Sequence, residues 1–141
     1  ALWIDGYQVN REQGEDRLTA TLRQGDSAMT LNGRGNGVVA AFVDALNTSL
    51  KNSLNTSLKN TLQQPLVLVE YSEHALSHEA GANAVSYVQI SIGGRRHNGV
   101  AISEDIVTAS FNAILNAVAA ATESAQSRLE TVKADTGIIA A

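Results

Sequence analysis

Cysteine is missing from this chain of 141 residues, and several other chemically special residue types are rare. The chain has three histidines, one proline and one tryptophan, and aromatic residues make up only 4% of it. Without Cys there are no disulfides, no thiol nucleophile and no Cys-ligated metal. Three imidazoles leave few groups for acid–base or metal-ion chemistry. We therefore expect a domain with no catalytic set and no cofactor of its own.

Positive charge and long apolar segments are also lacking. The formal net charge is −4, which argues against nucleic acid as a partner. No apolar run approaches the ~18 residues of a membrane-spanning helix, so we expect no membrane segment. The chain starts at Ala1 without a signal-like segment, and we expect it to be a piece of a longer protein.

The sequence does contain the pattern of one globular domain. Hydrophobic residues make up 44% of the chain, which is typical of a folded protein with its own core. In the first half, alternating apolar residues predict strands, and a 3.6-residue spacing then predicts a helix. The second half repeats this order. The predicted strands are 2–9, 17–23, 27–31, 66–75, 84–92 and 100–102, and the helices are 38–46 and 106–121.

Two pseudo-repeated βββα units are therefore predicted, and the fold class is α+β. Each unit has an antiparallel three-stranded sheet and a helix, and the units share a core because neither can bury both layers alone. Residues 40–47 (AAFVDALN) match residues 109–116 (ASFNAILN) at four positions, 69 residues apart. We place the domain at 1–121, with units at about 2–62 and 66–121. Residues 122–141 are expected to form a tail, helical and then frayed.

A second, shorter repeat follows the first predicted helix. Residues 46–53 (LNTSLKNS) are repeated almost unchanged as residues 54–61 (LNTSLKNT). The leucines recur every four residues, so a helix would carry them as one slowly turning stripe. We interpret the repeat as a local duplication that lengthens the first helix. The leucines are Leu46, Leu50, Leu54, Leu58 and Leu62.

Gly33-Arg34-Gly35-Asn36-Gly37 lies between a predicted strand and the first helix. Three glycines at alternate positions permit positive φ and close approach of a ligand. The N–H groups at the start of the helix suit a carboxylate or phosphate. A tight structural turn is the alternative. The segment is neither a Walker loop nor a dinucleotide-binding fingerprint, because the residues that must follow its glycines are absent.

Two small clusters of titratable residues have structural explanations. His74 and His78 are four residues apart, but four residues along a strand span ~13 Å, which is too far for one metal ion. Arg95-Arg96-His97 follows Gly93-Gly94, a hairpin signal, and is expected to be a solvated turn, with a phosphate contact as the alternative.

Four motifs, in order, resemble one known family. Residues 33–46 (GRGNGVVAAFVDAL) resemble the G-x-G-N-G-P-x-x-A-F-x-x-A-L signature of the C-terminal regulatory domain of 2-isopropylmalate synthase. Residues 70–76 (EYSEHAL), 82–88 (ANAVSYV) and 99–110 (GVAISEDIVTAS) also fit. The Tyr-x-Glu-His-Ala segment points to the actinobacterial and fungal-type branch. The resemblance covers about residues 4–120.

This resemblance implies a regulatory domain of two βββα units in a cytoplasmic enzyme of leucine biosynthesis. In the family, L-leucine binds at the interface of a homodimer and causes feedback inhibition of a distant active site. That site lies in a TIM barrel of the same parent chain. The barrel condenses acetyl-CoA with 3-methyl-2-oxobutanoate and uses a divalent metal. This chain contains none of the barrel, so the resemblance implies sensing and not catalysis.

Carried over position by position, the leucine site includes the turn before the first helix and parts of the second unit. The leucine carboxylate is expected at the N–H groups of the turn, the isobutyl group in a small apolar recess, and the ammonium near Glu70. The implied site residues are Gly35, Asn36, Gly37, Val39, Ala40, Leu68, Tyr71, Ala75, Ala82, Ala84 and Ile102.

Two departures from the family pattern accompany this resemblance. Val38 replaces the usual proline at the helix start, and the tandem repeat is not part of the pattern. Neither removes a site residue, although the repeat leaves helix length and dimer packing open. Two other functions also stay open: an isoleucine-sensing regulatory domain of citramalate synthase, and a dimerisation module that binds no ligand.

Overall fold

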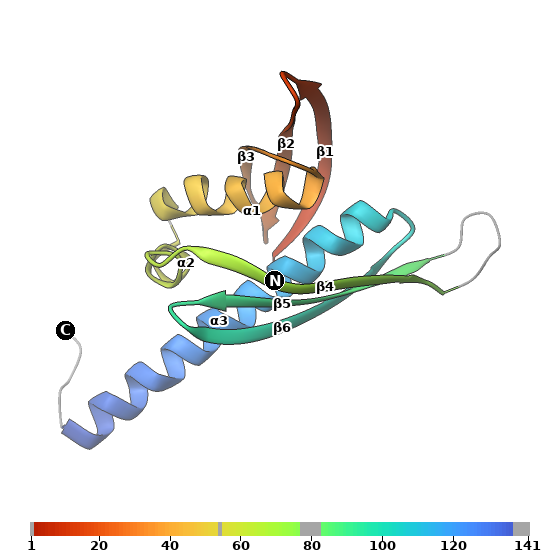
Figure 1. Cartoon of the computed structure of the whole chain (residues 1–141). Helices are drawn as coiled ribbons and strands as arrows, with labels where there is room; N and C mark the ends of the chain where they lie inside the picture. The colour runs from red at the N-terminus through yellow and green to blue at the C-terminus, as the bar shows by residue number, and fades with distance from the viewer. Residues whose placement is uncertain (1, 54, 77–82, 137–141) are drawn as a thin grey trace.

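The structure, a computed structural model, describes residues 2–53, 55–76 and 83–136 (Figure 1). Each half consists of three antiparallel strands followed by helical segments, so the predicted two-unit α+β fold is confirmed. The sheets have the strand orders β1-β2-β3 and β4-β5-β6. The strands are β1 (Leu2–Glu12), β2 (Glu15–Gln24), β3 (Ser27–Gly35), β4 (Leu66–Ala75), β5 (Ala84–Ile92) and β6 (Arg95–Ser103). The helices are α1 (Val38–Ser49), the 3-10 turn η1 (Leu50–Asn52), α2 (Thr56–Thr61) and α3 (Ile106–Thr136).

Both outer strands, β1 and β4, carry a bulge at the same place in their unit. The pairing changes register between Ile4 and Tyr7 in β1 and between Leu68 and Glu70 in β4. One extra residue reverses the alternation of side chains along a strand. As a result Tyr71, three residues after Leu68, lies opposite the buried Val88 on the helix side of its sheet.

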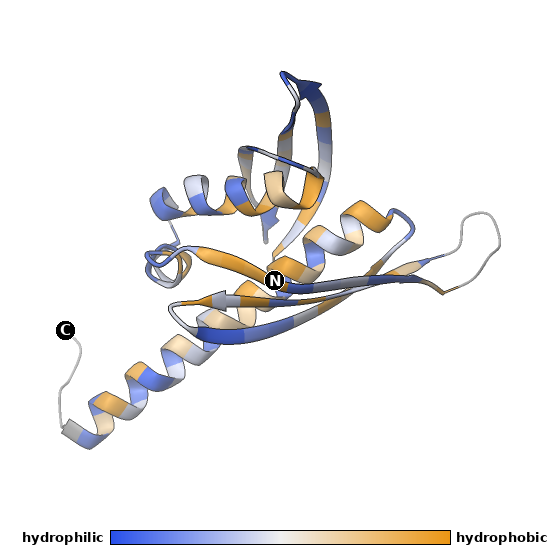
Figure 2. Ribbon diagram, viewed as in Figure 1, coloured by the Kyte–Doolittle hydropathy of each residue, from blue (hydrophilic) through white to orange (hydrophobic). Residues whose placement is uncertain are grey.

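The shared core is centred on two phenylalanines that the duplication relates. Phe42 of α1 and Phe111 of α3 are fully buried, and their rings stack with centroids 4.1 Å apart and planes 11° apart. Tyr7 packs edge-on against Phe111 at 5.4 Å. Apolar bands on β1, β4 and β5 face this region (Figure 2). Because stacked aromatic pairs combine burial with favourable ring geometry, this contact joins the two units.

Asparagine side chains join each helix to the outer strand of the other unit. Asn47 of α1 accepts the N–H of Leu66 at 2.8 Å and donates to its carbonyl oxygen at 3.0 Å. Asn112 of α3 accepts the N–H of Ile4 in β1 at 2.9 Å. These bonds satisfy edge-strand groups that would otherwise lack a partner. Each unit therefore needs the other to complete its outer strand.

The glycines of the expected ligand turn have a different role from the one that the sequence predicts. Gly33 and Gly35 lie in extended β3, and only Gly37 has a positive φ, of 110°. A Cβ on Gly33 would stand 2.2 Å from the carbonyl oxygen of Ala41. The close approach is thus that of α1 to its own sheet. Sequence alone does not show which backbone comes near a glycine.

The tandem repeat does not lengthen α1, and that prediction is wrong. The helix ends at Ser49, and a separate short helix, α2, begins at Thr56. Asn55 caps α2 by accepting the N–H of Leu58 at 3.1 Å. Asparagine favours such caps over helix interiors, which explains the break. Of the five leucines of the repeat, four are buried, and residue 54 lies outside the described residues. The buried leucines are Leu46, Leu50, Leu58 and Leu62.

The last helix, α3, continues without a break past residue 122, where the predicted tail begins, and ends at Thr136. It projects past its sheet (Figure 1). Residues 137–141 lie outside the described range. Among the described residues it is the one helix long and apolar enough to cross a membrane, over Ile106–Asp135, and its most apolar 18-residue window has a mean hydropathy of 1.2. Half of its most apolar window is buried inside the protein, and core helices pass the same test.

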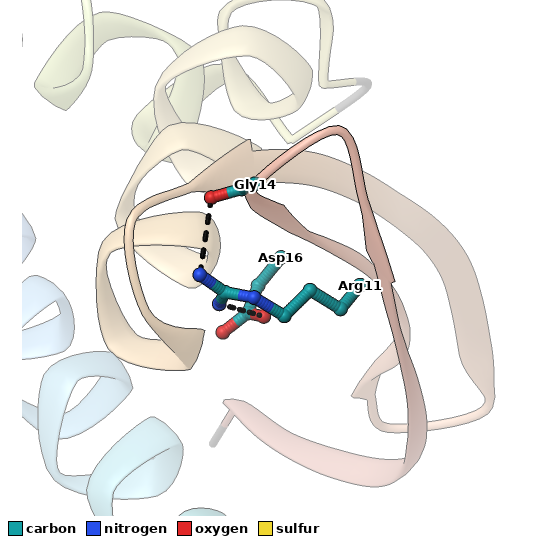
Figure 3. A network of polar contacts seen from close by, with 3 residues as sticks. All are labelled: Arg11, Gly14 and Asp16. Atoms are coloured by element: carbon teal, nitrogen blue, oxygen red, sulfur yellow. Dashed lines mark hydrogen bonds and ion pairs between the residues drawn. The ribbon is translucent and has the colours of Figure 1, made fainter.

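The free end of the β1–β2 hairpin is closed by one arginine (Figure 3). Arg11 Nη1 donates to Asp16 Oδ1 at 3.1 Å, and Nη2 donates to the Gly14 carbonyl oxygen at 3.2 Å. The turn residues Gln13 and Gly14 both have positive φ, 52° and 79°. An exposed ion pair of this kind adds at most ~1 kcal/mol. It fixes the turn locally and does not bear on the core.

The contact between β6 and α3 gives a test of the fold. A Cβ on Gly99 would lie 1.9 Å from the carbonyl oxygen of Ala113, which is backbone and cannot move aside alone. Gly99→Ala is expected to lower the free energy of unfolding by ~3 kcal/mol through overpacking. Asn98→Ala, at the exposed neighbouring position, should cost less than ~1 kcal/mol. Urea denaturation of both variants measures this, and equal stabilities would contradict the packing.

Candidate functional site

The turn between β3 and α1 leaves the start of the helix open. Gly37 is the N-cap, and its carbonyl oxygen accepts the N–H of Ala41 at 3.0 Å. Among the described residues no side chain caps this end, and the first turn of α1 holds no acidic residue. The first N–H groups of a helix lack partners within the helix, and the helix dipole favours negative charge there. The turn can therefore receive a carboxylate.

The start of α3 is closed by a carboxylate of the chain itself. Asp105 Oδ1 accepts the N–H of Val107 at 3.2 Å. Its Oδ2 accepts the hydroxyl of Tyr7 at 2.7 Å and that of Thr108 at 2.8 Å. Tyr7 comes from β1 of the other unit, 98 residues away. A negative charge at a helix N-terminus is favourable, and here it also ties the two units together.

Asp105 is the N-cap of α3. Its carbonyl oxygen accepts the N–H of Ala109 at 2.9 Å, which is the first bond of the helix. The hydroxyl of Ser103 instead accepts the N–H of Asp105 at 3.2 Å. Both residue types are good caps, so the sequence does not distinguish them.

The Tyr7–Asp105 contact changes the titration of both groups. Burial raises the pKa of Tyr7, and the hydrogen bond and negative charge of Asp105 raise it further, to about 12. Burial also tends to raise the pKa of Asp105. Hydrogen bonds from Tyr7, Thr108 and backbone N–H groups outweigh that effect, and the pKa of Asp105 lies below its usual value. Asp105 is thus a stable anion at neutral pH.

Tyr71 holds the position in β4 that Tyr7 holds in β1, since each follows the bulge of its strand. Its hydroxyl donates to Glu73 Oε2 at 2.7 Å. Burial raises the pKa of Tyr71, Glu73 raises it further, and Ser110 of α3 opposes the increase. Tyr7, which closes the α3 turn, therefore has a counterpart in Tyr71, whose hydroxyl donates to the neighbouring Glu73. The matching positions of the two tyrosines are the sequence signal that could have identified Tyr7.

The second sheet gathers some of the expected site residues on its helix side. Leu68 lies opposite the buried Ile90, and Ala75 lies opposite Ala84. Ala84 is an even number of residues from Ile90, so these positions share the face that carries Tyr71. Ile102 differs, because it pairs with Val85 on the other face and is 58% exposed. Ala82 lies outside the described residues.

The bulge in β4 determines which glutamate lies on the helix side of the sheet, beside Tyr71. Glu70 pairs with Gln89, on the face away from α3. Glu73 pairs with the fully buried Ser86 on the helix side, next to Tyr71. The Oγ atom of Ser86 has no hydrogen-bond partner among the described residues. Glu73 and Ser86 are polar members of this face that the sequence alone does not identify, because the bulge is not visible in it.

Within one chain these residues form two separate groups. The first group is the α1 turn, with Gly35, Asn36, Gly37, Val39 and Ala40. The second group is the helix-side patch of β4 and β5, with Leu68, Tyr71, Ala75 and Ala84. The hydrogen bonds between α1 and β4 lie at the far end of α1, where Asn47 holds Leu66. The described residues show no hydrogen bond between the two groups.

The outer face of the second sheet is an exposed apolar surface. A hollow of about 1030 Å³ lies there, with Tyr87 and Val100 among its walls and the polar Gln89 and Asn98 beside them. Exposed patches of this kind mark interaction surfaces more often than lone exposed side chains do. The exposed hydrophobic residues of this face are Val67, Tyr87, Val100 and Ile102.

Comparison with known proteins agrees with this geometry. The family model described as the LeuA allosteric (dimerisation) domain matches residues 2–122. A 2-isopropylmalate synthase of Leifsonia xyli subsp. xyli is 41% identical over 101 residues, 72% of this chain and 15% of that protein. The enzyme of the same name from Thermobifida fusca is 37% identical over 114 residues, 80% of the chain and 18% of the protein. The enzyme of the same name from Brucella suis is 32% identical over 111 residues, which are 79% of this chain and 18% of that protein.

A duplicated βββα fold with an open helix start and an exposed sheet face defines a regulatory and association domain. The chain belongs to the LeuA allosteric (dimerisation) domain family. The resemblance found in the sequence is thereby confirmed. The chain spans less than a fifth of the length of the curated relatives that it matches.

The Asp105 cap can be tested through its pH dependence. Asp105→Asn is expected to lower the free energy of unfolding at pH 7 by about 1.5 kcal/mol, because hydrogen bonds to a charged group are lost. A depressed carboxyl pKa stabilises the fold above the unfolded value of ~3.9 and loses this effect as the pH falls further. The difference between the two proteins should therefore be constant from pH 7 to about 4 and shrink below that.

Urea denaturation across this pH range measures the difference. Glu104→Gln, which removes the exposed neighbouring carboxylate, is the matched control and should behave like the unchanged protein. If the two variants had the same stability at pH 7, the Tyr7–Asp105 contact would not stabilise the fold.

Proposed function

We propose that this chain is the regulatory part of a cytoplasmic 2-isopropylmalate synthase and binds L-leucine between two copies of itself. Leucine binding then inhibits a catalytic domain elsewhere in the parent protein, which condenses acetyl-CoA with 3-methyl-2-oxobutanoate with the help of a divalent metal. The support is membership of an allosteric and dimerisation family whose matched relatives are 2-isopropylmalate synthases several times longer than this chain.

The observation that carries the proposal is the difference between two related helix starts. At α3 the carboxylate of Asp105 accepts bonds from Val107 and Tyr7. At α1 the N-cap is Gly37, and no side chain takes the place of Asp105. In the duplicated alignment Asn36 corresponds to Asp105, 69 residues apart. A free carboxylate from an amino acid supplies at α1 what the chain supplies for itself at α3.

The remaining groups of leucine find matching chemistry nearby. The N–H groups of Val39 and Ala40 hold its carboxylate. The hydroxyl of Tyr71, which donates to Glu73 within one chain, turns to donate to the leucine carboxylate, as Tyr7 donates to Asp105. Glu73, which lies beside Tyr71, accepts the ammonium in place of the expected Glu70. The apolar Leu68 contacts the isobutyl group. Small side chains at Ala75 and Ala84 leave room for it.

We place the site between two copies because, among the described residues of one chain, the hydrogen bonds between α1 and β4 lie at the far end of α1 and none joins the α1 turn to the helix-side patch. In the proposed homodimer the turn of one copy meets the β4–β5 patch of the other. The exposed apolar residues of the second sheet supply further area for association. Stable dimers bury ~1,200–2,000 Å² or more in total, and homodimer interfaces are more apolar than other protein surfaces.

Ligand titration tests this function and separates it from its alternatives. On a sample whose mass by sedimentation is that of two chains, L-leucine at ~100 times its Kd should stabilise the fold by ~2.7 kcal/mol. 4-Methylpentanoate lacks the ammonium and isopentylamine lacks the carboxylate, so both should give much smaller shifts in Tm. A larger shift with isoleucine would indicate the citramalate synthase type. No shift with millimolar leucine would indicate a dimerisation module without ligand.

One variant tests the position of the carboxylate. Asn36→Asp places an anion directly before the Gly37 N-cap, beside the free N–H groups of α1, so it should leave the fold intact and abolish the response to leucine. Asn10→Asp makes the same charge change on exposed β1 and should keep the response. Thermal unfolding with and without leucine measures both, and a full leucine response in Asn36→Asp would contradict the assignment of the α1 turn.

A further inference from the structure

The Arg95-Arg96-His97 cluster does not form the solvated turn that the sequence predicts. The turn is Gly93-Gly94, with φ of 59° and 78°, and β6 begins at Arg95. Arg95 and His97 pair with Ile92 and Ile90, so they lie on the side of the sheet that faces α3. Arg96 points to the opposite face, where its Nη1 donates to Gln89 Oε1 at 3.2 Å.

A second arginine reaches the same place from α3. Arg128 is half-buried, and its Nη1 donates to Ser124 Oγ at 2.7 Å. Together with Arg95 and His97 it lines a hollow of about 210 Å³ between the β5–β6 turn and the helix. Apolar residues and uncharged polar residues complete the walls: Ile92, Gly93, Ala121, Ala125, Asn60, Thr61 and Gln64.

Positive charge gathers here without a carboxylate to balance it. The ion pairs of the described residues, Arg11–Asp16, Arg23–Asp5 and Arg34–Glu15, all belong to the first sheet. Among the residues that the structure describes, no acidic side chain lines the hollow. Burial lowers the pKa of His97, and the charges of Arg128 and Arg95 lower it further. Like charges held together at an electrostatic cost, in a protein of net charge −4, are typical of an anion site.

The tandem repeat builds one wall of this hollow. Helix α2 consists of the second copy of the repeat, and Asn60 and Thr61 lie at its end. The hydroxyl of Thr61 donates to Thr122 of α3 at 3.1 Å and so fixes α2 against the helix. The repeat therefore has a structural consequence beyond spacing, because it closes the side of the hollow opposite β6.

We propose that this hollow binds a phosphate-class dianion, held by the guanidinium groups of Arg95 and Arg128 and by the imidazole of His97. Two guanidinium forks and an imidazole donor match the several oxygens and double charge of a tetrahedral oxyanion. The volume suits an ion or a single phosphate group and is below the ~300–1,000 Å³ of pockets for larger ligands. The hollow contains none of the residues of the proposed leucine site.

The test compares anions at constant ionic strength. Inorganic phosphate and sulfate should raise Tm and should raise the pKa of His97 followed by NMR, since a bound dianion favours the imidazolium. Chloride and acetate at matched ionic strength should do neither. A response to acetate as large as that to phosphate, or no movement of the His97 resonance with either dianion, would overturn the proposal.

Two substitutions place the effect at the hollow. Arg128→Gln should abolish the phosphate-dependent shifts, because it removes the helix side of the site. Arg96→Gln removes the same charge one residue from both Arg95 and His97, on the other face of the sheet, and should leave both shifts intact. If both variants lost the response equally, phosphate would be acting on general charge and not at this hollow.

Discussion

The stack of Phe42 on Phe111 is the contact on which the rest of the structure depends. The two rings lie 4.1 Å apart at the centre of a core that neither βββα unit closes alone. Around them each helix forms hydrogen bonds with the outer strand of the other unit. Asn47 of α1 bonds to β4, and Asn112 of α3 bonds to β1. Truncating either ring would cost ~3–5 kcal/mol and would loosen both sheets at once.

This reciprocal arrangement creates two related helix starts, and the function that we propose follows from their difference. Tyr7 of one unit meets Asp105 of the other and closes the start of α3. The start of α1 keeps a glycine cap and no acidic residue. A duplication thus yields one turn closed by the chain itself and one that no side chain of the described residues caps. The basic hollow between β6 and α3 is a separate departure from symmetry, because the tandem repeat exists only in the first unit.

Much of the fold can be predicted from the sequence, and the failures have physical causes. Alternation and spacing predict both βββα units, and the bounds of β4 and β5 agree with those predicted. The role of Gly33 is not predictable, because the helix that approaches it is a tertiary neighbour. The site residues follow from the resemblance and stay a prediction. Their faces depend on the β4 bulge, which puts Glu73 beside Tyr71 and turns Glu70 away.

The central claim is that the α1 turn receives the carboxylate of leucine at an interface between two copies. The most direct measurement is a crystal structure grown with L-leucine. The account predicts ligand density with its carboxylate at the N–H groups of Val39 and Ala40, and with Tyr71 of the second copy within hydrogen-bond distance. An empty α1 turn in a leucine-bound crystal, with the ligand elsewhere on the chain, would contradict it.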